Sequence, residues 1–181
     1  MASVEPNPNI EVLFSSADIE KRNNELSEQI EQEMGSDILV IAVLKGSFVF
    51  AADLIRSLHH AGVKPQIDFM ALSSYGDKKI SSGTVVITRD IMDTVKGRKV
   101  LLIDDILESG RTMEFATREL LGRGAAMVKT CLMLDKKGKR VVDFEADFVG
   151  FDCPDLFVIG YGLDYAHYYR ELPYIGHIVS E

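Results

Sequence analysis

Apolar residues along this chain gather in short continuous runs and at helically spaced positions, with polar segments between them. The run at 38–44 contains seven apolar residues without interruption, which predicts a strand that is covered on both faces. Runs that predict strands lie at 38–44, 66–72, 99–103, 126–134, 148–150 and 157–159. Several of these runs are separated by segments long enough to hold a helix.

Three of the intervening segments have the spacing of amphipathic helices. The first is predicted over 17–34, with Ser16 as its start signal and Gly35 as its stop signal. Its apolar face contains Ile19, Leu26, Ile30 and Met34. The second and third helices are predicted over 48–60 and 111–121. Apolar strands that alternate with helices predict an α/β fold, in which helices cover both faces of a mostly parallel sheet.

The segment at 73–83 interrupts this pattern, because it is polar and contains two glycines and four serines. Sequences typical of strands flank it at 67–72 and 84–90. This composition predicts a mobile loop between two strands, and mobile polar loops often cover active sites. A solvated hairpin connection without a functional role is the alternative interpretation.

The composition is typical of a globular protein, with 46% hydrophobic and 27% charged residues in a chain of 181. This length predicts one domain whose core can fold without disulfides or a structural metal. Cys131 and Cys153 match neither a disulfide framework nor a zinc site, so we expect reduced thiols. Since the sequence shows no signal-like N-terminus and no apolar run of membrane-spanning length, we expect a cytoplasmic protein without a membrane partner.

Acidic residues outnumber basic residues by 28 to 20, which gives a net charge of −8. A general nucleic-acid-binding protein would present a basic face, so this charge argues against nucleic acid as a partner. The charge argues less strongly against a small anionic substrate, because a local pocket can have the opposite sign.

The most informative stretch for chemistry is 100–113, where an apolar strand ends in the adjacent acids Asp104 and Asp105. Ligands of open α/β sheets bind at the carboxyl ends of the strands. A short turn at 106–110 leads into a helix near Arg111, and backbone amides at a helix start bind anions. Carboxylates beside an anion site suit a ribose 5-phosphate, with the acids on sugar hydroxyls or a divalent cation.

Other proteins have parts of this arrangement. The glycine–lysine pair of a Walker A loop is missing here. Response-regulator receiver domains also use acidic pairs at strand ends, but their pair lies near the start of the chain. Acids followed by a Gly/Ser/Thr turn also occur in α/β proteins simply as helix caps, and the stretch alone leaves that alternative open.

Residues 100–113 resemble the phosphoribosyl-pyrophosphate signature of the purine phosphoribosyltransferases. From about residue 10 to its end, the chain is similar to the hypoxanthine and hypoxanthine-guanine members of that family. Four further matching pieces follow the family's order, at 44–46, 73–83, 135–137 and 147–176. The resemblance implies the type I phosphoribosyltransferase fold in a single domain. Its core would span about 36–140, and its small hood would come from about 1–14 and 141–181.

The resemblance also implies an activity. Phosphoribosyl would pass from phosphoribosyl pyrophosphate to a 6-oxopurine, hypoxanthine or guanine, giving a nucleoside monophosphate and pyrophosphate with Mg²⁺ as cofactor. Asp104 and Asp105 would bind the ribose hydroxyls directly or through the metal, and Asp164 would coordinate the metal. The implied 5-phosphate residues are Ser109, Gly110, Arg111 and Thr112. The implied pyrophosphate residues are Lys45, Gly46 and Arg170, and a non-proline cis peptide is usual near Lys45.

The purine itself would meet a second group of residues. Glu108 matches the position of the family's general base, where many members carry Asp. Its extra methylene moves the carboxylate by more than about 1 Å, which leaves the base role open. Lys136 would contact the exocyclic oxygen, although it also belongs to a basic run that could simply be a solvated turn. The resemblance places Phe157 and Val158 on the purine, and Ser74 and Tyr75 on a covering loop.

Regulators that bind nucleic acid, including pyrimidine-operon attenuators, share this fold, so the fold alone does not separate them from enzymes. The acidic charge and the lack of residues for a second domain favour the enzyme. We expect a homo-dimer or homo-tetramer, while the ranking of hypoxanthine, guanine and xanthine is not readable from side chains.

Overall fold

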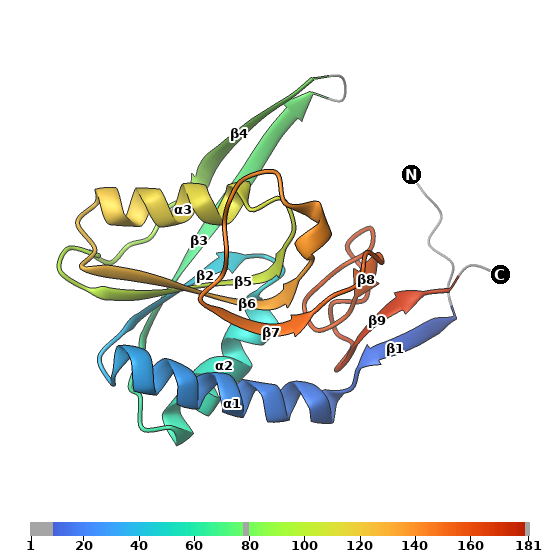
Figure 1. Ribbon diagram of the computed structural model, residues 1–181, viewed down its shortest axis with the longest axis horizontal. Coiled ribbons are helices and arrows are strands. Elements are labelled where there is room, and N and C mark those ends of the chain that lie inside the picture. Colours follow the sequence, from blue (N-terminus) through green and yellow to red (C-terminus); the bar gives the residue numbers. More distant parts are fainter. Residues whose placement is uncertain (1–8, 78–79, 180–181) are drawn as a thin grey trace.

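Six strands form the central sheet of the computed structural model, which describes residues 9–77 and 80–179 (Figure 1). In order across the sheet they are β4 (Ile80–Arg89), β3 (Gln66–Asp77), β2 (Leu39–Leu44), β5 (Lys99–Leu107), β6 (Met127–Asp135) and β7 (Phe148–Asp152). Every neighbouring pair is parallel except β3 and β4, which are antiparallel. The predicted α/β class with a mostly parallel sheet is confirmed.

Helices cover both faces of this sheet. Figure 1 shows α1 (Ser16–Met34) and α2 (Phe48–His60) on one face and α3 (Arg111–Gly122) on the other. Side chains alternate along each strand, so each strand supplies both layers of the core. Val40 and Leu101 pack with α1 and α2, whereas their neighbours Leu39 and Leu102 pack in the layer that contains α3. This two-sided burial explains the continuous apolar runs.

The first helix begins one residue earlier than the sequence analysis predicts. Ser15, rather than Ser16, is its N-cap, and it forms a capping box with Asp18. Burial of Asn23 and Ser27 on the inner face was not predicted from the apolar spacing. A short 3-10 helix, η1 (Lys137–Lys139), follows β6.

The polar segment at 73–83, predicted as a mobile loop or a hairpin connection between two strands, is largely strand in the structure. The strands β3 and β4 continue through most of it as a hairpin, with Ser74 opposite Val85 and Tyr75 opposite Thr84. Figure 1 shows the paired ends of these strands extending beyond the rest of the sheet. The side chains of 74–84, which include the two predicted loop residues, lie outside the described part of the structure.

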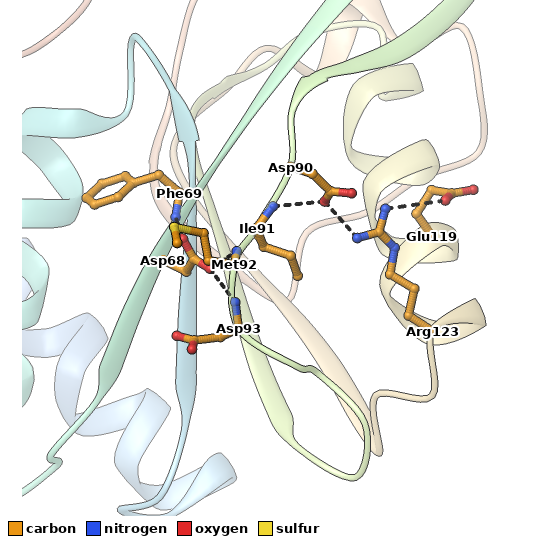
Figure 2. A network of polar contacts seen from close by, with 8 residues as sticks. All are labelled: Asp68, Phe69, Asp90, Ile91, Met92, Asp93, Glu119 and Arg123. Atoms are coloured by element: carbon orange, nitrogen blue, oxygen red, sulfur yellow. Dashed lines mark hydrogen bonds and ion pairs between the residues drawn. The ribbon is translucent and has the colours of Figure 1, made fainter.

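A polar network fixes the base of this hairpin (Figure 2). The Asp68 carboxylate, on β3, accepts hydrogen bonds from the backbone N–H groups of Met92 and Asp93 at 2.6 and 3.0 Å. At the end of β4, Asp90 accepts a hydrogen bond from Arg123, just beyond α3, at 2.7 Å. Hydrogen bonds with the backbone lower the pKa of Asp68 against the opposing effect of its burial, so this carboxylate stays ionised.

A second, three-stranded sheet has the order β1 (Ile10–Phe14), β9 (Ile175–Ile178) and β8 (Val158–Ile159). It forms the small hood expected from the two ends of the chain. Because β7 pairs with β6 in the central sheet, the chain leaves that sheet after Asp152 and not at about residue 140. The sequence analysis missed β9, whose Gly176 allows close approach to β1: an added Cβ there would lie 2.6 Å from the Glu11 carbonyl oxygen.

Among the residues that the structure describes, none of the helices is long and apolar enough to span a membrane.

Candidate active site

Three strand ends meet at one edge of the central sheet. β2 and β5 are parallel neighbours, with Ala42 opposite Ile103, so both end at the same edge. On the other side of β5, β6 ends with Asp135 opposite Leu107. The segments brought together there are 45–47, 104–112 and 135–137. The peptide bond between Leu44 and Lys45, at the first of these ends, is cis.

The paired acids lie inside β5 and not after it. Because β5 continues to Leu107, the turn before α3 is shorter than the 106–110 turn that the sequence analysis expects. Asp104 is only 9% exposed, and its carboxylate accepts a hydrogen bond from the Asp105 N–H at 2.9 Å. Burial raises the pKa of Asp104, and the neighbouring Asp105 carboxylate raises it further. Burial also raises the pKa of Asp105.

Asp104 is buried and Asp105 is half-buried, and two such carboxyl groups with raised pKa values are costly to ionise side by side. Groups that donate hydrogen bonds, or a cation, would stabilise their ionised forms. Sugar hydroxyls and a divalent metal are both of this kind. The pair is therefore suited to bind one of them at this edge of the sheet.

The turn between β5 and α3 surrounds a cavity of about 240 Å³. Its lining residues are Asp104, Ile106, Leu107, Glu108, Ser109, Gly110, Thr112 and Met113. Gly110 is the N-cap of α3 and has a left-handed backbone with φ of 82°, which glycine adopts without strain. The first amides of a helix have no acceptor within it, so they make this cavity a natural anion site.

Glu108 and Lys136 form an ion pair across the ends of β5 and β6. The Lys136 Nζ lies 2.7 Å from the Glu108 Oε1, and the lysine side chain is 8% exposed whereas the glutamate is 49% exposed. The backbone N–H of Lys136 also donates a hydrogen bond to the Leu107 carbonyl at 2.9 Å. Lys136 is therefore a buried cation beside the cavity rather than part of a solvated turn.

The opposite side of the site is closely packed. An added Cβ at Gly46 would lie 1.5 Å from the Asp105 Oδ2, and one at Gly162 would lie 2.1 Å from the Gly46 carbonyl oxygen. Arg170 donates to the Gly162 carbonyl at 2.5 Å and pairs with Asp164 at the same distance. Its positive charge also acts on Asp105, whose pKa it lowers against the effect of burial. The hood segment that carries these residues therefore contacts the turn after β2.

The remaining predicted residues lie on the hood. Phe157 is 60% exposed and its ring lies edge-to-face with that of Tyr165, with 5.6 Å between the centroids. Val158 is buried in β8. An exposed aromatic ring of this kind can stack on a flat ligand.

Arg140 also belongs to this region, although it was not predicted. The basic run at 136–140 left a solvated turn open as an alternative, but the Arg140 side chain is only 15% exposed and pairs with Asp135. A basic run gives no sign of which member is buried, so no sequence signal could have singled it out.

The family model described as phosphoribosyl transferase domain matches residues 10–166. The chain is 44% identical over 166 residues to the hypoxanthine-guanine phosphoribosyltransferase of Aquifex aeolicus, with 91% of this chain and 92% of that protein covered. It is 45% identical to the enzyme of the same name from Bacillus subtilis, with 91% of both chains covered. The hypoxanthine phosphoribosyltransferase structure from Staphylococcus aureus has a TM-score of 0.89 at 39% identity, covering 99% and 96% of the two chains.

Proposed function

The chain belongs to the phosphoribosyl transferase family, in which it is an enzyme of purine salvage, and we propose that its own substrates are phosphoribosyl pyrophosphate and a 6-oxopurine. Hypoxanthine and guanine are the proposed acceptors, and a nucleoside monophosphate and pyrophosphate are the products. One observation carries the proposal: an acidic pair, a helix-start anion cavity and a buried lysine meet at a single sheet edge.

The reaction exchanges one bond at the anomeric carbon of ribose for another. The bond to pyrophosphate breaks, a bond to a purine nitrogen forms, and positive charge develops on the sugar ring. We assign Asp104 and Asp105 to the ribose hydroxyls, where their carboxylates also stabilise that charge. Backbone amides and hydroxyl groups at the start of α3 hold the 5-phosphate and so fix the position of the sugar. The residues that supply them are Ser109, Gly110, Arg111 and Thr112.

The purine lies against the Glu108–Lys136 pair in this proposal. Lys136 donates to the exocyclic oxygen, which an ammonium group favours over the amino group of adenine. Glu108 accepts the proton that the purine imidazole ring releases as the new bond forms. Phe157 stacks on the purine face, and the backbone of Val158 contacts its edge.

The pyrophosphate lies on the opposite side, against Lys45, Gly46 and Arg170. Arg170 is already paired with Asp164, so the incoming anion would share or replace that partner. We further propose that the β3–β4 hairpin, through Ser74 and Tyr75, covers the reacting centre and excludes water.

Mg²⁺ is the proposed cofactor, with Asp164 as a direct ligand on the pyrophosphate side and Asp104 and Asp105 contacting the metal directly or through its water on the ribose side. The donor set fits, because Mg²⁺ prefers oxygen and often binds through one or two carboxylates together with substrate phosphates. In the part of the chain that the structure describes, no group of three or more His, Cys, Asp or Glu side chains could hold a metal alone. Substrate oxygens and water would therefore complete the coordination. When bound, the metal supplies positive charge that neutralises the pyrophosphate.

The broader assignments are also proposals. The chain is taken as one domain, 1–181, that acts in the cytoplasm as a homo-dimer or homo-tetramer without nucleic-acid or membrane partners. The net charge of −8 supports the absence of a nucleic-acid partner.

A panel of bases tests the proposed activity. The protein is incubated with phosphoribosyl pyrophosphate, Mg²⁺ and each of hypoxanthine, guanine, xanthine, adenine and uracil, and nucleotide is measured by chromatography. We expect product from hypoxanthine and guanine, none from adenine or uracil, and loss of all product when the metal is chelated. Failure to form a nucleotide from any base would exclude the enzyme, and product from uracil alone would favour the attenuator alternative.

Glu108→Gln is expected to lower kcat by about 10²- to 10⁴-fold, which is the usual contribution of a general base. The amide retains an oxygen that can accept from Lys136, so the KM for phosphoribosyl pyrophosphate is expected to change little. Steady-state kinetics with hypoxanthine provides the measurement. Glu114→Gln, on the exposed side of α3, is the matched control. An unchanged rate in a single-turnover measurement would remove Glu108 from the chemistry.

A further inference from the structure

The guanidinium of Arg140, the last residue of the basic run at 136–140, is bound mainly by groups inside the protein. Its Nε donates to the Phe144 carbonyl at 3.0 Å. One terminal nitrogen, Nη1, donates to the carbonyls of Leu107 and Glu108 at 3.0 and 2.8 Å. The other, Nη2, pairs with the Asp135 carboxylate, whose side chain is 1% exposed. The three guanidinium nitrogens thus have partners in three different segments.

The first of these segments is the turn that surrounds the anion cavity. Leu107 ends β5, and Glu108 and Ser109 follow it in the turn. The N–H groups of Val141 and Val142 both donate to the Ser109 carbonyl, at 3.0 and 3.2 Å. The carbonyls of 107–109 therefore all accept hydrogen bonds from the segment 140–142.

Gly110 shows how closely the two segments pack. An added Cβ at Gly110 would lie 2.9 Å from Val142 Cγ2 and 3.2 Å from Phe144 Cβ. Val142 and Phe144 thus pack directly against Gly110, which has a left-handed backbone conformation. Since Gly110 is the N-cap of α3, this packing also fixes where the first amides of the helix lie.

The second segment is the end of β6. Asp135 directly precedes Lys136, and the Lys136 N–H donates to the same Leu107 carbonyl that Arg140 contacts. One guanidinium thus joins the strand end that carries the lysine to the turn that carries the phosphate cavity.

We propose that Arg140 is a positioning residue that sets the distance between the 5-phosphate cavity and the Glu108–Lys136 pair. The proposal deepens the proposed function and rests on it, because a nucleotide product must span both places. Arg140 contacts backbone carbonyls and Asp135 and is not assigned a contact with substrate. Its effect on the reaction passes through the two segments that it connects.

Arginine is suited to this role because it has five N–H donors in a fixed planar fork. A lysine at the same position would keep the positive charge, yet its single nitrogen cannot reach carbonyls on both sides of the fork. Arg140→Lys therefore removes the connection while it retains the charge.

The experiment compares Arg140→Lys with Arg22→Lys in the full-length chain. Arg22 is the matched control, because its partly buried side chain also donates to two carbonyls, those of Val149 and Gly150, and pairs with Glu25. It joins α1 to β7 and not the two site segments. Thermal unfolding, kcat and both KM values are measured for each variant.

We expect Arg140→Lys to raise the KM for phosphoribosyl pyrophosphate and for hypoxanthine together, and to lower kcat/KM by about 10- to 100-fold, as displacements near 1 Å can do. Arg22→Lys should change the unfolding midpoint without changing either KM by more than about threefold. If Arg140→Lys does not fold, Asp135→Asn takes its place in the experiment. The asparagine keeps an oxygen that can accept from Arg140 but removes the negative charge of the ion pair. We expect Asp135→Asn to raise both KM values.

Equal kinetic changes in the two arginine variants, or KM values for Arg140→Lys that match the wild type, would overturn the positioning role. If Asp135→Asn is used in place of Arg140→Lys, KM values equal to those of the wild type would overturn the positioning role as well. These outcomes differ from failure of the proposed function, in which the wild-type protein itself forms no nucleotide. Binding of a nucleoside monophosphate to the wild type, measured by calorimetry, separates the two cases further.

Discussion

Asp104→Asn is expected to raise the midpoint of thermal unfolding and, in the same protein, to lower phosphoribosyl transfer by about 100-fold or more. The stability gain follows from burial, which raises the pKa of Asp104 and makes its ionised form costly. An asparagine oxygen can still accept the hydrogen bond from the Asp105 N–H, but it brings no charge into the strand end. A gain of about 2–4 °C corresponds to roughly 1 kcal/mol in a chain of this size.

The way in which the free energy of unfolding depends on pH shows whether ionised Asp104 destabilises the fold. A carboxyl group whose pKa is raised by folding keeps its proton in the folded chain after the unfolded chain has lost it. The free energy of unfolding therefore falls as the pH rises from the ordinary carboxyl pKa, about 3.9, through the raised folded value. Wild type should show this fall in a series of thermal melts, and Asp104→Asn should show a smaller one.

The loss of activity has a different origin. Removing one preorganised charge from a developing cation typically costs about 10²- to 10³-fold in rate. Nucleotide formation is measured with saturating substrates and Mg²⁺. Asp93→Asn, an exposed acid in the loop after β4, is the control and should leave both quantities close to wild type. A destabilised but active Asp104→Asn would contradict the assignment on both counts.

Gly46→Ala is expected to lower kcat/KM by about 100-fold or more, because the added methyl group cannot coexist with the present position of Asp105. Its carbon would lie 1.5 Å from the Asp105 Oδ2 and 2.5 Å from the Asp105 Cγ. Either the carboxylate or the turn after β2 must move, and displacements near 1 Å in a catalytic site can cost about that factor. The same conflict should lower the unfolding midpoint.

Gly122→Ala is the control for this substitution, since an added Cβ there meets nothing within 4 Å. Kinetics and thermal unfolding of both alanine variants provide the measurement. A Gly46→Ala protein with wild-type kcat/KM would show that Asp105 can leave its place without consequence, and would remove it from the ribose site.

Much of the fold could be predicted because burial leaves a direct mark on sequence. The strands β2 and β5 are covered on both faces, so they appear as continuous apolar runs, and the acids at the end of the second run mark the site. The lengths of these strands were less predictable. β5 extends to Leu107 through hydrogen bonds with β6, which the side chains of 104–107 do not reveal.

The parts that were missed depend on contacts between distant segments. Arg140 looks like any other member of a basic run, and only the fold puts three carbonyls and a carboxylate around it. In the same way, Gly162 matters because a side chain there would collide with the Gly46 carbonyl oxygen, more than a hundred positions earlier in the chain. The extent of the strands through the polar 73–83 segment was not predicted, because pairing between strands outweighs its weak local preference for a strand.

The hood sheet has a consequence for how the protein is made. β9 is its middle strand and pairs with β1 near the start of the chain and with β8 near the end. On a ribosome, β1 therefore has no partner until translation has reached 175–178. The central sheet has all its strands earlier, since β7 ends at Asp152. The strands of the central sheet are thus synthesised before the hood sheet can be completed, so a chain that stalls before β9 would carry the acidic pair without the finished hood.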